Sequence, residues 1–309
     1  MDVRARMDQC SGSGKYPVSF EEIDQRYHLK MRAFIKLCMP PLFKDLERHF
    51  DLEAMRRRGI IPIMFHLTFE SSDIPLVFLS VARMTHQVRL CRSVTEPPGA
   101  APIERLLLDM RIQIHAPRGS GDPKKLGASE AALPEVRVGA MRALQVLTRP
   151  VAPPGERQVV QVPDELSGLN VHPLGEPFPV PEHLAGQPAG FAPAPEGPFP
   201  SFDTVWSLPN TDVNQHVNVQ EYVMGMENHF ARRLHGAGLP VARHRIARAQ
   251  LVFRKPFFPG ETVRVQGPLL VKGAQTLLIG GYHRLQPDGS PEGRPSVAVR
   301  MEGVLDAPA

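Results

Sequence analysis

Leu208-Pro-Asn-Thr-Asp-Val-Asn-Gln-His-Val-Asn-Val-Gln-Glu-Tyr222 is the most informative stretch of this 309-residue sequence. It places a carboxylate, a carboxamide and an imidazole at alternate positions, Asp212, Asn214 and His216. An aspartate is ordinarily ionised at neutral pH and can serve as nucleophile or general base. A histidine can shuttle a proton, and an asparagine can orient the carboxylate or a water. These three residues are therefore the candidate catalytic residues.

The residues after this loop have the pattern of a helix. Apolar residues recur at near-helical spacing from Val217 to Leu234, and Gly236 and Gly238 would end the helix. If Val217 opens the helix, the backbone amides of Val217 and Asn218 point towards the loop and can stabilise an oxyanion. Aspartate and asparagine also cap helices, so capping without catalysis is the alternative interpretation of the loop.

A weaker copy of the loop lies near the N-terminus, in Ile23-Asp-Gln-Arg-Tyr-His-Leu-Lys-Met-Arg-Ala-Phe34. Asp24 and His28 precede Asp212 and His216 by the same offset of 188 residues. Arg26 and Lys30 replace the two asparagines, and cations beside a carboxylate form ion pairs more readily than they activate water. We interpret Asp24 and His28 as a degenerate, structural counterpart; the alternative is that the two cations bind an anionic substrate group.

The repeat divides the chain into three parts. Residues 16–116 form an N-terminal module, residues 201–306 form a C-terminal module with the candidate site, and residues 117–200 form a linker. Many of the 33 prolines lie in runs within 150–200, and proline blocks both helices and central strands. A short helix is expected within this linker, around 127–147.

Each module is predicted to contain one long helix followed by strands, which is the α+β class. In the N-terminal module the helix runs from about Ala33 to Arg58, with a break or kink at Pro40-Pro41. Strands are expected over 76–94, 106–116, 246–255, 262–271, 276–283 and 296–305.

The segment Asp212-Val-Asn-Gln-His-Val-Asn218, with Tyr222 four residues later, resembles the signature loop of plant-type acyl–acyl carrier protein thioesterases of the hotdog superfamily. Phe253-Arg-Lys-Pro-Phe-Phe-Pro-Gly-Glu261 resembles a strand and turn of the same superfamily that ends in Pro-Gly-Asp. The resemblance implies a tandem double hotdog, in which an antiparallel sheet wraps each central helix. It also implies an enzyme that hydrolyses a fatty-acyl or polyketide-type thioester on acyl carrier protein or coenzyme A.

The sequence departs from that family at several positions. A glutamate–cysteine pair that the family uses after the helix is replaced by Pro256 and Phe257, and Val219 replaces a second asparagine. Two alternatives therefore stay open: a hotdog dehydratase or hydratase acting on a 3-hydroxyacyl thioester, and a non-catalytic acyl-binding protein. The first motif of tandem-hotdog dehydratases, His-x-x-x-Gly-x-x-x-x-Pro, is absent.

Five arginines near the end of the predicted helix, Arg232, Arg233, Arg243, Arg245 and Arg248, form a second candidate site. They would bind the phosphate of a carrier arm or the acidic surface of a carrier protein. The alternative is that they complement the helix dipole on a solvated face.

The overall composition is that of a soluble globular protein, with 42% hydrophobic and 22% charged residues. A net charge of +4 suits an anionic ligand, but no nucleic-acid-binding module accompanies it. No apolar run is long enough to span a membrane. The three widely spaced cysteines predict a cytoplasmic protein with inert thiols. We expect no metal or other cofactor, and a monomer or homodimer.

Overall fold

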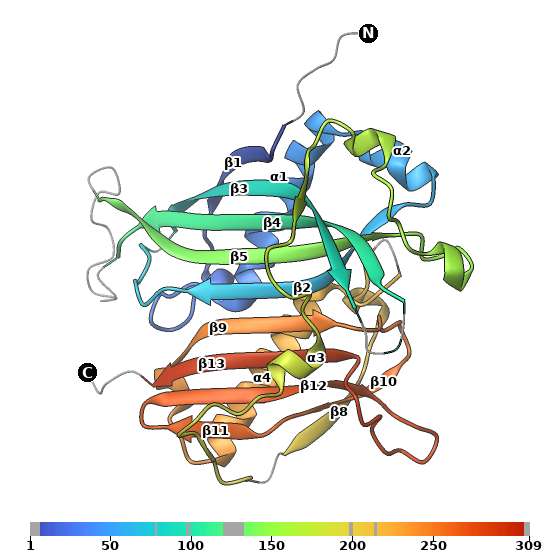
Figure 1. Cartoon of the computed structure of the whole chain (residues 1–309). Coiled ribbons are helices and arrows are strands. Elements are labelled where there is room, and N and C mark those ends of the chain that lie inside the picture. The colour runs from blue at the N-terminus through green and yellow to red at the C-terminus, as the bar shows by residue number, and fades with distance from the viewer. Residues whose placement is uncertain are drawn as a thin grey trace.

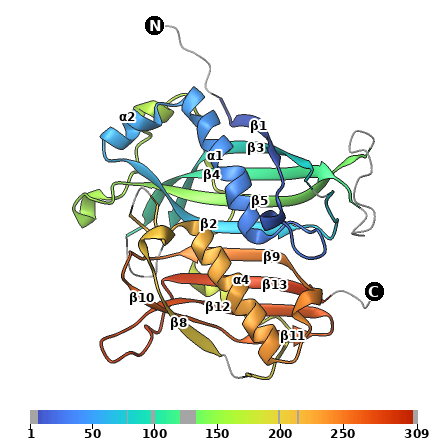
Figure 2. The same ribbon diagram turned by 180° about the vertical axis from the view of Figure 1, so that it is seen from behind.

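The computed structural model describes residues 7–77, 79–96, 99, 101–119, 133–197, 200–212 and 215–305. Its strands form one continuous 13-stranded sheet with the order β1-β3-β4-β5-β2-β9-β13-β12-β10-β8 (Figure 1). Two long helices lie against the same face of this sheet (Figure 2). The protein is therefore a large antiparallel sheet with few helices, as the α+β prediction requires.

The two halves of the sheet have the same connectivity. The first half contains β1 (Cys10–Pro17), the turn η1 (Phe20–Glu22), α1 (Met31–His49), α2 (Leu52–Arg57), β2 (Ile61–Ser71), β3 (Val81–Thr95), β4 (Ile103–Pro117) and β5 (Glu135–Thr148). The second contains β8 (Ser201–Val205), the turn η6 (Leu208–Asn210), α4 (Val219–Gly236), η7 (Val241–Arg243), β9 (His244–Phe253), β10 (Thr262–Gln266), β11 (Leu269–Lys272), β12 (Gln275–Arg284) and β13 (Val297–Leu305). Read outward from the centre, the strand orders β2-β5-β4-β3-β1 and β9-β13-β12-β10-β8 correspond one to one.

The halves join where β2 pairs antiparallel with β9, with His66 opposite Val252 and Glu70 opposite Arg248. Backbone hydrogen bonds thus continue across the junction, and neither central strand has an exposed edge there. The two helices bury their apolar sides against the sheet on either side of this junction. Val223, Met226 and Phe230 face the core from α4, at the spacing expected for an amphipathic helix.

The ends of α4 are fixed by local hydrogen bonds. Asn218 is the N-cap, and its side chain accepts a hydrogen bond from the backbone amide of Gln220. At the other end Gly238 has φ 71°, and the amide of Leu239 donates to the carbonyl of Leu234. A left-handed glycine with such a bond ends a helix. The helix predicted from Val217 to Leu234 is therefore confirmed, with its start two residues later.

The segment between the halves crosses the opposite face of the sheet (Figure 1). It contains η4 (Pro154–Glu156), η5 (Asp164–Leu166), β6 (Val171–Pro173), α3 (Pro181–Leu184) and β7 (Ala192–Pro193). The ring of Phe178 packs on Phe65 with centroids 4.4 Å apart, and Leu184 packs with Val252 and Ala298. The proline-rich linker thus covers apolar side chains that this face of the sheet would otherwise expose.

Three predictions about individual elements are wrong. The helix expected around 127–147 falls partly outside the described residues, and its remainder is β5, because strands β4 and β2 flank residues 135–148 on both sides. Pro40 and Pro41 lie inside one α1 that ends at His49, and the helix resumes after Phe50 as α2. The strand expected over 262–271 is two strands, since Gly267 and Pro268 separate β10 from β11.

No helix in the described part of the chain is both long enough and apolar enough to cross a membrane.

Candidate active site

The candidate loop forms a compact turn between η6 and α4. The amide of Asp212 donates to the carbonyl of His216 over 3.0 Å, and the amide of Gln215 donates to the carbonyl of Asp212 over 2.9 Å. Gln215 has φ 62°, a left-handed conformation that closes the turn. Asp212 and His216 are consequently brought together at the base of the turn, and the Asp212 side is exposed to solvent.

Asn214 lies outside the described residues, so its predicted contact with Asp212 and His216 stays a prediction. The ring of His216 is partly buried against Phe258, with ring centroids 5.1 Å apart. Phe258 belongs to the turn after β9 that the sequence analysis singled out. The turn therefore holds the imidazole beside the loop.

The N-terminal loop has the same backbone geometry at an offset of 188 residues. The amide of Asp24 donates to the carbonyl of His28 over 2.8 Å, and Tyr27 has φ 66° in the place of Gln215. Before each loop a serine caps a short turn, Ser19 for η1 and Ser207 for η6. The repeat inferred from Asp24 and Asp212 is therefore present in the backbone as well.

The two aspartates differ in their surroundings. The Oδ1 atom of Asp24 accepts the backbone amides of Arg26 and His28, and its Oδ2 atom lies 3.4 Å from Nδ1 of His28. Burial alone would raise the pKa of Asp24, but these contacts outweigh it and hold the pKa below its usual range. The carboxylate of Asp24 is thus occupied by its own loop, whereas that of Asp212 is exposed.

The predicted oxyanion-binding amides are already in use. The amide of Val217 donates to the carbonyl of Phe257 over 3.0 Å, and that of Asn218 donates to the carbonyl of Asn210 over 2.8 Å. Because α4 begins at Val219, both residues precede the helix. This corrects the assignment of Val217 and Asn218: the first amide of the helix itself, which has no helical acceptor, is that of Val219.

An aromatic cluster supports the loop from below. Tyr222 is buried, and its hydroxyl accepts the amide of Phe257 over 3.3 Å. The carbonyl of the same Phe257 receives the amide of Val217. The hydroxyl of Tyr282 donates to the Tyr222 carbonyl over 2.6 Å, and the ring of Trp206 meets both tyrosines. The loop is therefore connected to β12 and to the turn after β9 through Tyr222.

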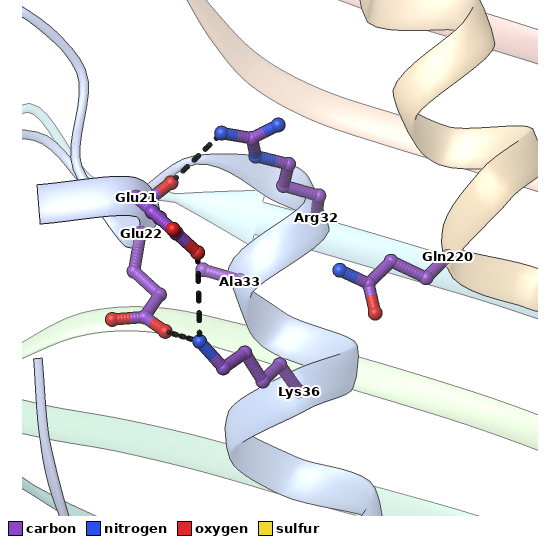
Figure 3. Close-up of a pocket in the computed structure, with 6 residues that line it drawn as sticks. All are labelled: Glu21, Glu22, Arg32, Ala33, Lys36 and Gln220. Atoms are coloured by element: carbon purple, nitrogen blue, oxygen red, sulfur yellow. Dashed lines mark hydrogen bonds and ion pairs between the residues drawn. The ribbon is translucent and has the colours of Figure 1, made fainter. Parts of the chain in front are cut away.

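A cavity of about 340 Å³ lies where the first turns of the two helices meet (Figure 3). Arg32 and Gln220 line it from α1 and α4 and occupy equivalent positions of the repeat, again 188 residues apart. The guanidinium of Arg32 donates to the carbonyl of Glu21, and the ammonium of Lys36 lies 2.5 Å from Glu22. The remaining lining residues are Glu21, Glu22 and Ala33. The cavity therefore presents cations, an amide and carboxylates close to the start of α4.

Glu227 of α4 reaches the N-terminus of α1 near this cavity. Its carboxylate accepts the amide of Met31 over 3.1 Å. Burial raises the pKa of Glu227 to about 7, against the opposing effects of Arg32 and Lys30. This contact joins the two halves through a group that titrates near neutrality.

We expect Glu227→Gln to leave stability unchanged at pH 5 and to increase it by about 1–3 kcal/mol at pH 8. Because the pKa in the folded protein lies above the ordinary value of 4.5, ionisation costs stability, and that cost grows between about pH 4.5 and 7. Glutamine keeps an acceptor for Met31 without the charge. Urea unfolding at both pH values measures the difference, with Glu47→Gln, an exposed position on α1, as control. Equal effects of Glu227→Gln at the two pH values would contradict this assignment.

The predicted arginine site does not form a single surface. Arg233 is buried and donates to the carbonyl of Glu196, and Arg232 stacks on Phe202 at 4.4 Å. Arg245 donates to the carbonyl of Ser71, and Arg248 lies 3.9 Å from Glu70. Both of these last contacts cross to β2, so they support the junction of the halves. Arg243 is partly buried and has a partner of its own.

Sequence reasoning did not identify Arg32, Lys36, Gln220 or Glu227. The repeat offset alone was a usable signal for two of them, because it equates Arg32 with Gln220 at the starts of the two helices. No local pattern marks Glu227, whose partner lies 196 residues away in the chain.

No protein-family model matches this sequence. No curated protein matches it significantly. Solved structures do match over almost the whole chain. A protein from Lactobacillus plantarum described as an oleoyl thioesterase has a TM-score of 0.62 at 12% identity, with 96% of both chains covered. An acyl-ACP thioesterase from Bacteroides thetaiotaomicron has a TM-score of 0.57 at 12% identity, with 96% of this chain and 98% of that chain covered. The 12:0-ACP thioesterase from Umbellularia californica has a TM-score of 0.58 at 11% identity, with the same coverage.

At such low identity these matches establish the fold. The protein has the fold of hotdog acyl-ACP thioesterases, as the resemblance of its sequence implied.

Proposed function

We propose that this protein is a tandem double hotdog thioesterase that hydrolyses a fatty-acyl or polyketide-type thioester on acyl carrier protein or coenzyme A. The observation that carries the proposal is the contrast between two superimposable loops. Asp24 is bound by its own loop, while Asp212 is exposed beside His216 at the start of α4. A carboxylate that served only to shape the turn would be expected to make the contacts that Asp24 makes.

In the proposed reaction Asp212 acts as general base and Asn214 orients the attacking water. Asp212 removes a proton from the water, and the resulting hydroxide attacks the thioester carbonyl. The carbon–sulfur bond then breaks, and the thiol leaves with a proton from His216. The oxyanion lies near the amide of Val219, where the helix dipole favours negative charge.

The cavity between the helices is proposed to receive the polar arm of the carrier. Arg32 and Lys36 suit a phosphate or carbonyl oxygen, and Gln220 suits an amide. In this arrangement the first half contributes binding groups to a reaction that the second half catalyses. This division explains why one loop is free to react and the other is not.

The test is to incubate the protein with acyl-CoA and acyl–acyl carrier protein of several chain lengths and to follow free thiol with a chromogenic reagent. We expect thiol release in proportion to enzyme, with a preference for one carrier. Loss of water from a 3-hydroxyacyl thioester without thiol release would instead identify a dehydratase. Tight acyl binding without either reaction would identify a binding protein.

A further inference from the structure

Four polar side chains gather at the far end of α1 from the cavity. Cys10 comes from the first residue of β1, Asp45 and His49 from the last turns of α1, and His86 from β3. The sulfur of Cys10, a carboxylate oxygen of Asp45 and a ring nitrogen of His49 lie within 4.8 Å of one another. The Nε2 atom of His86 lies 3.0 Å from Oδ2 of Asp45.

We propose that Cys10, Asp45 and His49 bind a divalent transition-metal ion of the zinc class, with His86 orienting Asp45. A thiolate, an imidazole and a carboxylate are the ligand types that Zn²⁺ takes in proteins, and a thiolate disfavours Mg²⁺ and Ca²⁺. Metal–ligand bonds of about 2.0–2.3 Å place tetrahedral ligands about 3.3–3.8 Å apart. The observed limit of 4.8 Å therefore requires side-chain movements of about 1 Å.

The backbone leaves room for this group of side chains. Gly12 lies opposite His86 in the pairing of β1 with β3 and two residues after Cys10 on the same face. A Cβ atom at Gly12 would lie 1.8 Å from Oδ2 of Asp45 and 2.7 Å from the ring of His86. Any larger residue would therefore displace both side chains.

Burial and access fit a metal site. Cys10 is buried, and the side chain of His86 is 1% exposed, whereas His49 is exposed and gives an ion a path from solvent. A hydrogen bond from an imidazole to a ligating carboxylate is the usual outer-shell arrangement of metal sites. Arg48 lies 3.1 Å from Oδ1 of Asp45, and this exposed arginine must move aside when the ion binds.

Sequence spacing gives no sign of this site. Asp45 and His49 are four residues apart, which places them on one side of a helix. The other two residues come from separate strands, so the pairing of β1 with β3 creates the site. The three ligands leave a fourth position open for water or a small anion.

The test is titration of the chelator-treated, tag-free full chain with Co²⁺, followed by competition with Zn²⁺. We expect one ion per chain and a thiolate-to-cobalt charge-transfer band. Cys10→Ser should abolish the band, and His49→Ala should weaken binding at least about tenfold. Cys38→Ala, a buried thiol on the same helix, and His235→Ala, an exposed histidine near the end of α4, serve as matched controls.

His49 is exposed, so its replacement leaves the core intact and keeps the test valid if Cys10→Ser does not fold. Circular dichroism establishes that each variant is folded. Unchanged affinity in His49→Ala, a cobalt band that survives in Cys10→Ser, or no binding at millimolar Co²⁺ would each overturn the proposal.

Discussion

Asp212→Asn should lower the rate of thioester hydrolysis by about 10³-fold, because a positioned general base typically contributes 10²–10⁴-fold. Asparagine has nearly the same shape as aspartate but cannot accept the proton of water. The loss corresponds to about 4 kcal/mol in the activation barrier. Since Asp212 is exposed and its backbone makes the turn, the variant should fold normally.

Asp24→Asn is the matched control. Both backbone amides that Asp24 receives bind its Oδ1 atom, which asparagine retains. We expect this variant to keep a rate within a few-fold of wild type. Thiol release from the preferred substrate, measured at equal folded concentration, compares the two. If Asp212→Asn kept full activity, or if both variants lost it equally, the assignment of the reaction to the second half would be wrong.

The pseudo-repeat was the part of the fold that the sequence predicted best. Asp24 with Asp212 and His28 with His216 share one offset, and local turns with left-handed residues depend on few neighbours. Such geometry is encoded within a dozen residues. The helix of the second half was predictable for the same reason, since its apolar spacing and its terminal glycines are local signals.

The failed predictions concern residues whose structure depends on distant partners. Residues 135–148 have apolar positions that suit a helix as well as a strand, and only β2 and β4 on either side decide for the strand. Arg245 and Arg248 looked like a surface cluster until β2 was placed beside β9. The cavity depends on how the two helices approach each other, which no single segment encodes.

Tyr222→Ala should lower the free energy of unfolding by about 3–5 kcal/mol, the range observed when a buried aromatic side chain is removed. Tyr222 is 2% exposed and contacts the rings of Trp206, Phe253 and Tyr282. Its loss would leave a cavity between α4 and the sheet, directly beneath the candidate loop. Urea unfolding of wild type and variant measures the change.

Tyr222→Phe separates packing from positioning. This variant keeps the ring but leaves the amide of Phe257 without its acceptor, at a cost of about 1–3 kcal/mol. Because the carbonyl of Phe257 receives the amide of Val217, we expect kcat to fall while KM changes little. Tyr27→Phe in the first loop is the control and should change neither quantity. A loss of stability in Tyr222→Phe with an unchanged kcat would mean that Tyr222 supports the fold alone, and that the loop keeps its geometry without it.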